Sequence, residues 1–145
     1  MRLAFNIFNL DSIEALAEAV DQTNLPGFMQ VSASTVKYLG AKNLFKIHNN
    51  TNRKGLIKLH LDHCNDIKFI KMCIDSGWTS VMADFSNEPI EINIRKLNEI
   101  RQYLPKSIGQ IEGEVGSIGG AEDGFITDYH GKARIEDVRM IFEHT

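Results

Sequence analysis

The sequence lacks any hydrophobic run long enough to cross a membrane, which takes about 20 consecutive apolar residues. The first residues, MRLAFNIFNLDS, do not make the apolar core of a signal peptide, because Asn6 and Asn9 interrupt them. Only two cysteines are present, Cys64 and Cys73, and they do not have the spacing of a metal site. We therefore expect reduced thiols in a soluble, cytoplasmic protein.

The sequence also lacks an excess of positive charge. It has 16 Lys and Arg residues and 19 Asp and Glu residues, so the net charge is −3 and the pI is near 5.9. A nucleic-acid-binding protein needs a basic surface against the phosphates, and this balance predicts none. Linkers, low-complexity tracts and internal repeats are missing too. The 145 residues, 43% of them hydrophobic, fit a single domain spanning residues 1–145.

What the sequence does contain is a regular alternation of short apolar runs and helical patterns. The apolar runs predict strands over residues 2–8, 27–32, 55–62, 79–85 and 107–115. The helical patterns cover 11–20 (with Asp11 and Glu14 as a capping box), 36–49, 66–76 (Asp66 as N-cap, Gly77 as stop), a segment starting at Pro89, and a last helix from Ile135. This alternation predicts an α/β fold of about five β/α units, with parallel strands and right-handed crossovers.

Residues 116–132, GSIGGAEDGFITDYHGK, are interpreted as one long glycine-rich loop. The glycines of this segment would also suit a phosphate-binding loop. That signal is weak, because the Lys-Ser/Thr of a P-loop and the full G-x-G-x-x-G spacing are both missing. Loops of this length in a compact domain are usually functional or disordered. We favour a loop that carries an acid–base group, Glu122 or Asp123, over the site; a plain surface loop is the alternative.

Polar side chains stand at the ends of four predicted strands. In chain order they are Ser32, Asp62 with His63, Asp84 and Glu114. The steps between them are close to one β/α unit, which takes roughly 30 residues because about 250 residues make eight units. Since the carboxyl ends of parallel strands share one rim, these side chains are expected side by side.

Three carboxylates and one imidazole at a common rim would repel one another unless a cation held them. A divalent metal is the simplest cation, and this donor set suits Zn²⁺ or a similar ion; solvated strand-end residues are the alternative. His60 is interpreted as a hydrogen-bonded core histidine or as support for a metal ligand. Glu112 shares a strand face with Glu114, and Lys58 shares one with His60 and needs a partner if it points inward.

Three segments in this order, LHLDHC, SVMADFS and IEGEVGSIGGAEDG, resemble the class II, metal-dependent fructose/tagatose-bisphosphate aldolases. The resemblance covers nearly the whole chain. It implies a TIM (β/α)8 barrel and a Zn²⁺ ion that polarises the ketone of a dihydroxyacetone-phosphate unit and stabilises its enediolate. The implied activity is that of an aldehyde-lyase of carbohydrate metabolism and glycolysis, acting on a sugar phosphate and working as a homo-oligomer.

The resemblance also implies roles for single residues. Asp62 would donate and accept the proton of the C4 hydroxyl, and His63 would be a ligand of the catalytic zinc. Asp84 and Glu114 match carboxylates that hold a second divalent metal or an alternative zinc position. Glu122 would move a proton at the enediolate carbon, and Ser32 would contact the substrate.

Several features depart from the family pattern. Phe85 stands where a glycine is common, Lys58 stands where a small apolar residue is usual, and the single acid before Asp123 is more like the tagatose branch. Five strands cannot close an eight-stranded barrel, and the family's other zinc ligands and phosphate-binding segments are not present. His130 or His144 would be the substitutes in a rearranged site. The alternative function is accordingly a non-catalytic aldolase-like remnant, or an association module with an open sheet edge.

Overall fold

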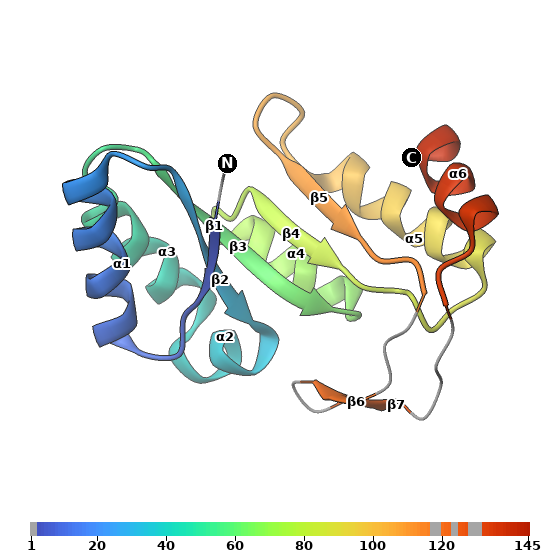
Figure 1. The fold of residues 1–145 in the computed structure, drawn as a ribbon, viewed down its shortest axis with the longest axis horizontal. Coiled ribbons are helices and arrows are strands. Elements are labelled where there is room, and N and C mark those ends of the chain that lie inside the picture. The colour runs from blue at the N-terminus through green and yellow to red at the C-terminus, as the bar shows by residue number, and fades with distance from the viewer. Residues whose placement is uncertain (1–2, 117–119, 123–124, 128–131) are drawn as a thin grey trace.

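The computed structural model describes residues 3–116, 120–122, 125–127 and 132–145. Its centre is a five-stranded parallel sheet whose strands follow one another in chain order (Figure 1). The strands are β1 (Leu3–Asn6), β2 (Gly27–Ser32), β3 (Ile57–Cys64), β4 (Ser80–Ala83) and β5 (Gln110–Gly113). The helices are α1 (Leu10–Thr23), α2 (Ala33–Leu39), α3 (Ala41–Thr51), α4 (Ile67–Asp75), α5 (Ile90–Tyr103) and α6 (Ile135–His144). The predicted alternation of strands and helices is confirmed.

The two faces of the sheet differ because side chains alternate along each strand. One face is apolar and packs under the helices, with Met29, Leu61 and Val81 completely buried. Trp78, just before β4, is 1% exposed, and its indole N–H donates to the backbone carbonyl of Ala41 at 3.1 Å. The opposite face is polar. Strand pairing there aligns one row across four strands: Gln30, His60, Ser80 and Gln110.

Three local predictions are corrected. Helix α1 is capped by Asn9 and not by Asp11: the Asn9 side chain accepts from the Ser12 N–H, and Ser12 Oγ accepts from the Asn9 N–H. The single helical stretch over 36–49 is two helices, since Gly40 has a φ of 86° between α2 and α3. The fifth strand is shorter than predicted, because a turn in which the Gly109 N–H donates to the Pro105 carbonyl precedes it.

The segment over residues 116–132 is not a single loop. Strands β6 (Gly120–Glu122) and β7 (Phe125–Thr127) form an antiparallel pair in which Ala121 faces Ile126. Strands of three residues are too short to produce a periodic pattern. The Asp-Gly dipeptide between them, typical of two-residue hairpin turns, was the available sequence signal.

Within the described ranges, none of the helices combines the length and hydrophobicity needed to cross a membrane. The sheet has an edge on each side. All four residues of β1 are exposed, and so are three of the four residues of β5. The intervening strands β2, β3 and β4 carry most of the buried positions.

Candidate metal and acid–base site

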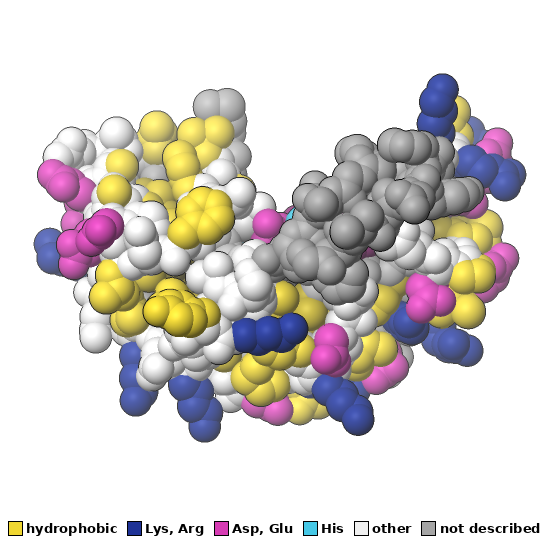
Figure 2. All heavy atoms as spheres, turned by 90° about the horizontal axis from the view of Figure 1, so that it is seen from below, with side chains coloured by type: hydrophobic (Ala, Val, Ile, Leu, Met, Phe, Trp, Pro, Cys, Tyr) yellow, Lys and Arg dark blue, Asp and Glu magenta, His cyan; other side chains and the backbone are white. Residues whose placement is uncertain are grey.

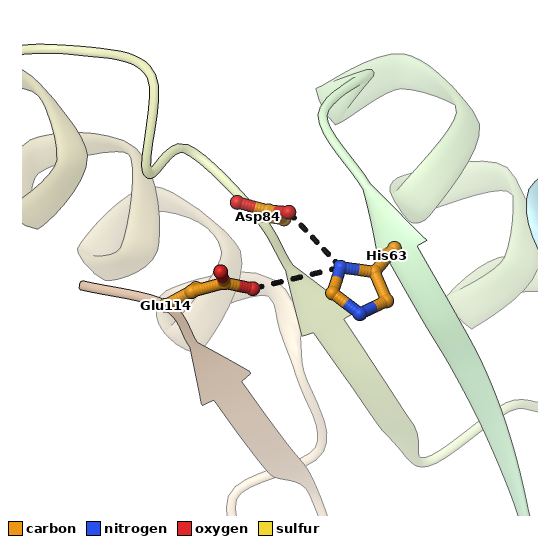
Figure 3. A group of neighbouring side chains, drawn as sticks. All are labelled: His63, Asp84 and Glu114. Carbon is orange, nitrogen blue, oxygen red and sulfur yellow. Dashed lines mark hydrogen bonds and ion pairs between the residues drawn. The ribbon is translucent and has the colours of Figure 1, made fainter. Parts of the chain in front are cut away.

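Three of the predicted residues meet at the carboxyl ends of neighbouring strands. His63 lies near the end of β3, Asp84 follows β4 and Glu114 follows β5. His63 Nδ1 is 3.0 Å from Asp84 Oδ2 and 3.6 Å from Glu114 Oε2 (Figure 3). One donor atom from each residue lies within 4.8 Å of the others. Figure 2 views the molecule from this end of the sheet and shows acidic and histidine side chains close together there. The predicted rim is therefore present.

A bulge in β3 places His63 in this cluster. In a regular strand, Asp62 and His63 would point to opposite faces. The pairing of β3 with β4 shifts register between Leu61 and Cys64, and His63 has a φ of 37°. That left-handed conformation is uncommon for a residue other than glycine and costs on the order of 1 kcal/mol. The bulge lets His63 reach Asp84 and Glu114 while Asp62 remains on the polar face.

Asp84 is held as an anion. Its Oδ1 accepts from the Ser86 backbone N–H at 3.0 Å and from the Ser86 hydroxyl at 2.7 Å. Its Oδ2 faces His63 Nδ1, which must carry the proton of that hydrogen bond because a carboxylate only accepts. Burial alone would raise the pKa of Asp84, but the hydrogen bonds from His63 and Ser86 outweigh burial and hold the pKa below its usual value.

The donor set fits a divalent metal ion. Nitrogen and oxygen ligands at about 2.0–2.2 Å from a tetrahedral zinc lie roughly 3.3–3.6 Å from one another. The separations of 3.0 and 3.6 Å from His63 are close to that spacing. The side chains of His63, Asp84 and Glu114 are 32%, 20% and 24% exposed, so an ion can reach them from solvent. In this arrangement a metal would replace the proton on His63 Nδ1.

Asp62 and Ser32 lie beside this cluster in paired strands. Ser32 faces Asp62 in the register of β2 and β3. Asp62 Oδ2 accepts a 2.8 Å hydrogen bond from the Gln30 side-chain amide, which orients the carboxylate on the polar face. Ser32 is the N-cap of α2, where its hydroxyl accepts from the Thr35 N–H at 3.4 Å. Gln30 was not among the predicted site residues, although it lies two residues before Ser32 and therefore on the same strand face.

The other predicted site residues are Glu122, Asp123, His130 and His144. The backbone of Glu122 is part of β6, but its side chain lies outside the described residues, as do Asp123 and His130 altogether. His144 ends α6, and its carbonyl accepts from the Asn98 side chain at 2.7 Å. Within the part of the chain that the structure describes, His144 does not join the cluster.

A second histidine–carboxylate contact lies deeper on the polar face. His60 is 5% exposed; its Nδ1 is 2.8 Å from Ser80 Oγ and its Nε2 is 3.7 Å from Glu112 Oε2. Burial lowers the pKa of His60 to about 4, so the ring is neutral at pH 7. The interpretation of His60 as a hydrogen-bonded core histidine is confirmed. Lys58 on the same strand finds a partner in the Ile108 carbonyl at 3.2 Å.

Known proteins resemble this chain in sequence and in fold. The family model for class II fructose-bisphosphate aldolase matches residues 2–145. A fructose-bisphosphate aldolase of Staphylococcus aureus (strain Mu50) is 31% identical over 129 residues, covering 86% of this chain and 45% of the relative. A 6-phospho-5-dehydro-2-deoxy-D-gluconate aldolase of Halalkalibacterium halodurans is 35% identical over 147 residues, covering 96% and 50%. The crystal structure of the YdjI aldolase from Escherichia coli K12 matches with a TM-score of 0.81 at 19% identity, covering 99% and 52%.

The chain spans about half the length of these relatives, at 45% and 50% of the two sequences. The fold is correspondingly part of a (β/α)8 barrel, with five strands in the parallel sheet that the structure describes. The expected family and fold class are thus confirmed.

Proposed function

The chain belongs to the class II fructose-bisphosphate aldolase family, and we propose that it supplies the metal-binding and acid–base part of an aldolase active site. The proposed reaction is the reversible cleavage of a ketose bisphosphate to dihydroxyacetone phosphate and an aldehyde. The observation that carries this proposal is the convergence of His63, Asp84 and Glu114 at the ends of three neighbouring strands. An imidazole and two carboxylates held this closely are the donors of a divalent metal site.

The proposed metal is Zn²⁺, with a second divalent metal as an addition at Asp84 and Glu114. When bound, it supplies the positive charge that polarises the substrate ketone. The residues of the chain prepare that site. In the absence of the ion, the hydrogen bond to Asp84 orients the His63 ring and Ser86 keeps Asp84 ionised. Glu114 would add a second negative charge that offsets the charge of the ion.

Asp62 is the proposed base for carbon–carbon cleavage. It takes the proton of the C4 hydroxyl while the C3–C4 bond breaks, its electron pair moves toward the ketone and C4 becomes the aldehyde carbon. The hydrogen bond from Gln30 holds the Asp62 carboxylate in one orientation, and Asp62 directly precedes His63 in the chain. By family resemblance, Glu122 returns a proton to C3, and Ser32, next to Asp62 in the strand register, contacts the substrate.

The remaining parts of the proposal rest on the length and composition of the chain and on the family resemblance. They are a single domain over residues 1–145, a homo-oligomeric state, a sugar phosphate as substrate and a cytoplasmic place in glycolysis. Phe85 and Lys58 depart from the family pattern, so both fructose and tagatose bisphosphates are to be tested as substrates.

A second candidate function is a non-catalytic association module. It is favoured by the exposed edges β1 and β5, and by an apolar stripe on α6 in which Ile135 is 69% and Phe142 is 85% exposed. Unpaired strands and exposed apolar faces are typical of surfaces that bind another polypeptide.

An assay of aldol cleavage separates the two functions. The zinc-loaded 145-residue chain is tested on fructose and tagatose 1,6-bisphosphate, and dihydroxyacetone phosphate is detected enzymatically. For an aldolase site, Asp62→Ala lowers turnover by roughly 10²–10⁴-fold while zinc content and melting temperature are retained. The control is Asp75→Ala, which removes an exposed carboxylate bonded to Tyr103 and should not change turnover. A folded, zinc-loaded wild-type chain without turnover would favour the association module.

A further inference from the structure

Asn93 is a buried polar residue that the proposed chemistry does not use. It is the fourth residue of α5 and is 2% exposed. Its side-chain Nδ2 donates to the backbone carbonyl of Glu114 at 2.9 Å, and its Oδ1 has no hydrogen-bond partner among the residues described. Asparagine is a weak helix former, and a buried amide with one end unsatisfied is unfavourable. Local helix stability therefore does not account for an amide here, whereas the bond to Glu114 does.

The bonded carbonyl lies at the point where β5 leaves the sheet. The pairing of β4 with β5 ends at Ala83 and Gly113, so the Glu114 carbonyl lies one residue beyond the last strand pair. Strand β5 is an exposed edge of the sheet. At the Glu114 carbonyl, the hydrogen bond from the Asn93 side chain therefore takes the place of a backbone hydrogen bond between strands.

Helix α5 also approaches β5 closely at the preceding residue. A Cβ atom added to Gly113 would lie 2.9 Å from Leu97 Cδ1, which is closer than side chains normally pack. Asn93 and Leu97 are four residues apart and therefore lie on the same face of the helix. One face of α5 thus contacts two successive residues of the chain, Gly113 by packing and Glu114 by a hydrogen bond.

We propose that Asn93 is a positioning residue that holds Glu114 in place for the metal site. The Glu114 backbone, fixed by Asn93, directs the carboxylate so that Oε2 lies 3.6 Å from His63 Nδ1. This inference rests on the proposed function, in which Glu114 is a metal ligand. Asn93 itself does not contact the ion or the substrate.

Zinc affinity is the first test, measured by competition with a chelator on the 145-residue chain. Asn93→Ala should weaken zinc binding by about 10- to 100-fold, the usual effect of removing a group that orients a ligand. The matched control is Asn98→Ala on the same helix, which removes a 2.7 Å side-chain bond to the His144 carbonyl and should leave the affinity unchanged. Asn93→Leu, which has a similar volume but no hydrogen-bonding group, should reproduce the loss without a large cavity. Wild-type affinity in both Asn93 variants would overturn the proposal.

A double-mutant cycle distinguishes positioning of Glu114 from general damage to the fold. If Asn93 acts through the Glu114 carboxylate, Asn93→Ala should cost little further affinity in a Glu114→Ala background. An equal loss in both backgrounds would overturn the proposal, because Asn93 would then act on the site independently of Glu114.

A measurement without metal keeps this inference separate from the proposed function. In the zinc-free chain, the NMR carbonyl resonance of Glu114 should shift in Asn93→Ala and stay in place in Asn98→Ala. No shift in Asn93→Ala would overturn the positioning role. A wild-type chain that binds no zinc would overturn the proposed metal site, while the Glu114 shift would still support the contact that Asn93 makes.

Discussion

The site joins two regions that are held with very different strength. Strands β3 and β4 form the centre of the core: all four residues of β4 are buried, as are five of the eight of β3. Strand β5 has three exposed residues out of four, and α6 has no buried residue. His63 and Asp84 come from the first region and Glu114 from the second. Two of the three donors therefore follow core strands, whereas the third follows an edge strand that is held by its pairing with β4 and by contacts from α5.

The two regions should differ most in the unfolding free energy that is lost when an aromatic ring is removed. Trp78→Ala should lower the free energy of unfolding by about 3–5 kcal/mol, since the ring is fully buried and its N–H is bonded to Ala41. Phe142→Ala on α6, where the ring is 85% exposed, should change it by less than about 0.5 kcal/mol. Urea unfolding of both variants provides the measurement. Equal costs would show that α6 is as much a part of the core as β4.

The second prediction concerns pH and the buried side of the site. The pKa of His60 is about 4 in the folded chain, below the usual value of about 6.5 for an unfolded chain. The unfolded chain therefore takes up this proton first as the pH falls. The contribution of neutral His60 to the free energy of unfolding is complete above about pH 6.5. It is lost as the pH falls toward 4, by at most about 1.4 kcal/mol per pH unit.

His60→Gln should reduce that loss, because the variant has no proton to take up in this range. Unfolding free energies measured between pH 7 and pH 4 provide the comparison with the wild-type chain. The same slope in both proteins would mean that His60 is not the group responsible.

The third prediction concerns the contact between α5 and β5. Gly113→Ala forces its Cβ against Leu97 and should lower the unfolding free energy by about 1–2 kcal/mol while also weakening zinc binding. Gly27→Ala in β2 is the matched control, since its Cβ would meet the nearest atom at an ordinary 3.5 Å. That variant should be neutral or slightly stabilising, because alanine is less flexible than glycine in the unfolded chain. Thermal unfolding and zinc titration are measured for both variants. Equal stability and equal zinc affinity would show that close packing at Gly113 does not matter for the site.

The same contrast explains how much could be predicted from the sequence. The core strands were predictable because apolar runs between helix signals, such as the Asp66 N-cap, place His63 and Asp84 one β/α unit apart. The bulge at His63 was not predictable, because it depends on pairing with β4 and not on local pattern. The hairpin of β6 and β7 was missed because its strands are short. Asn93 could not be singled out from the sequence, because its proposed role depends on a contact with Glu114, 21 residues further along the chain.

X-ray absorption of the zinc-loaded chain would show whether His63, Asp84 and Glu114 bind the metal. A metal held by His63, Asp84 and Glu114 predicts one zinc per chain with only nitrogen and oxygen neighbours at about 2.0–2.2 Å, including one imidazole from the protein. His63→Ala should remove that imidazole and most of the bound zinc. Two results would contradict this metal site. One is a sulfur neighbour at about 2.3 Å, which would come from Cys64 or Cys73. The other is an unchanged spectrum in His63→Ala.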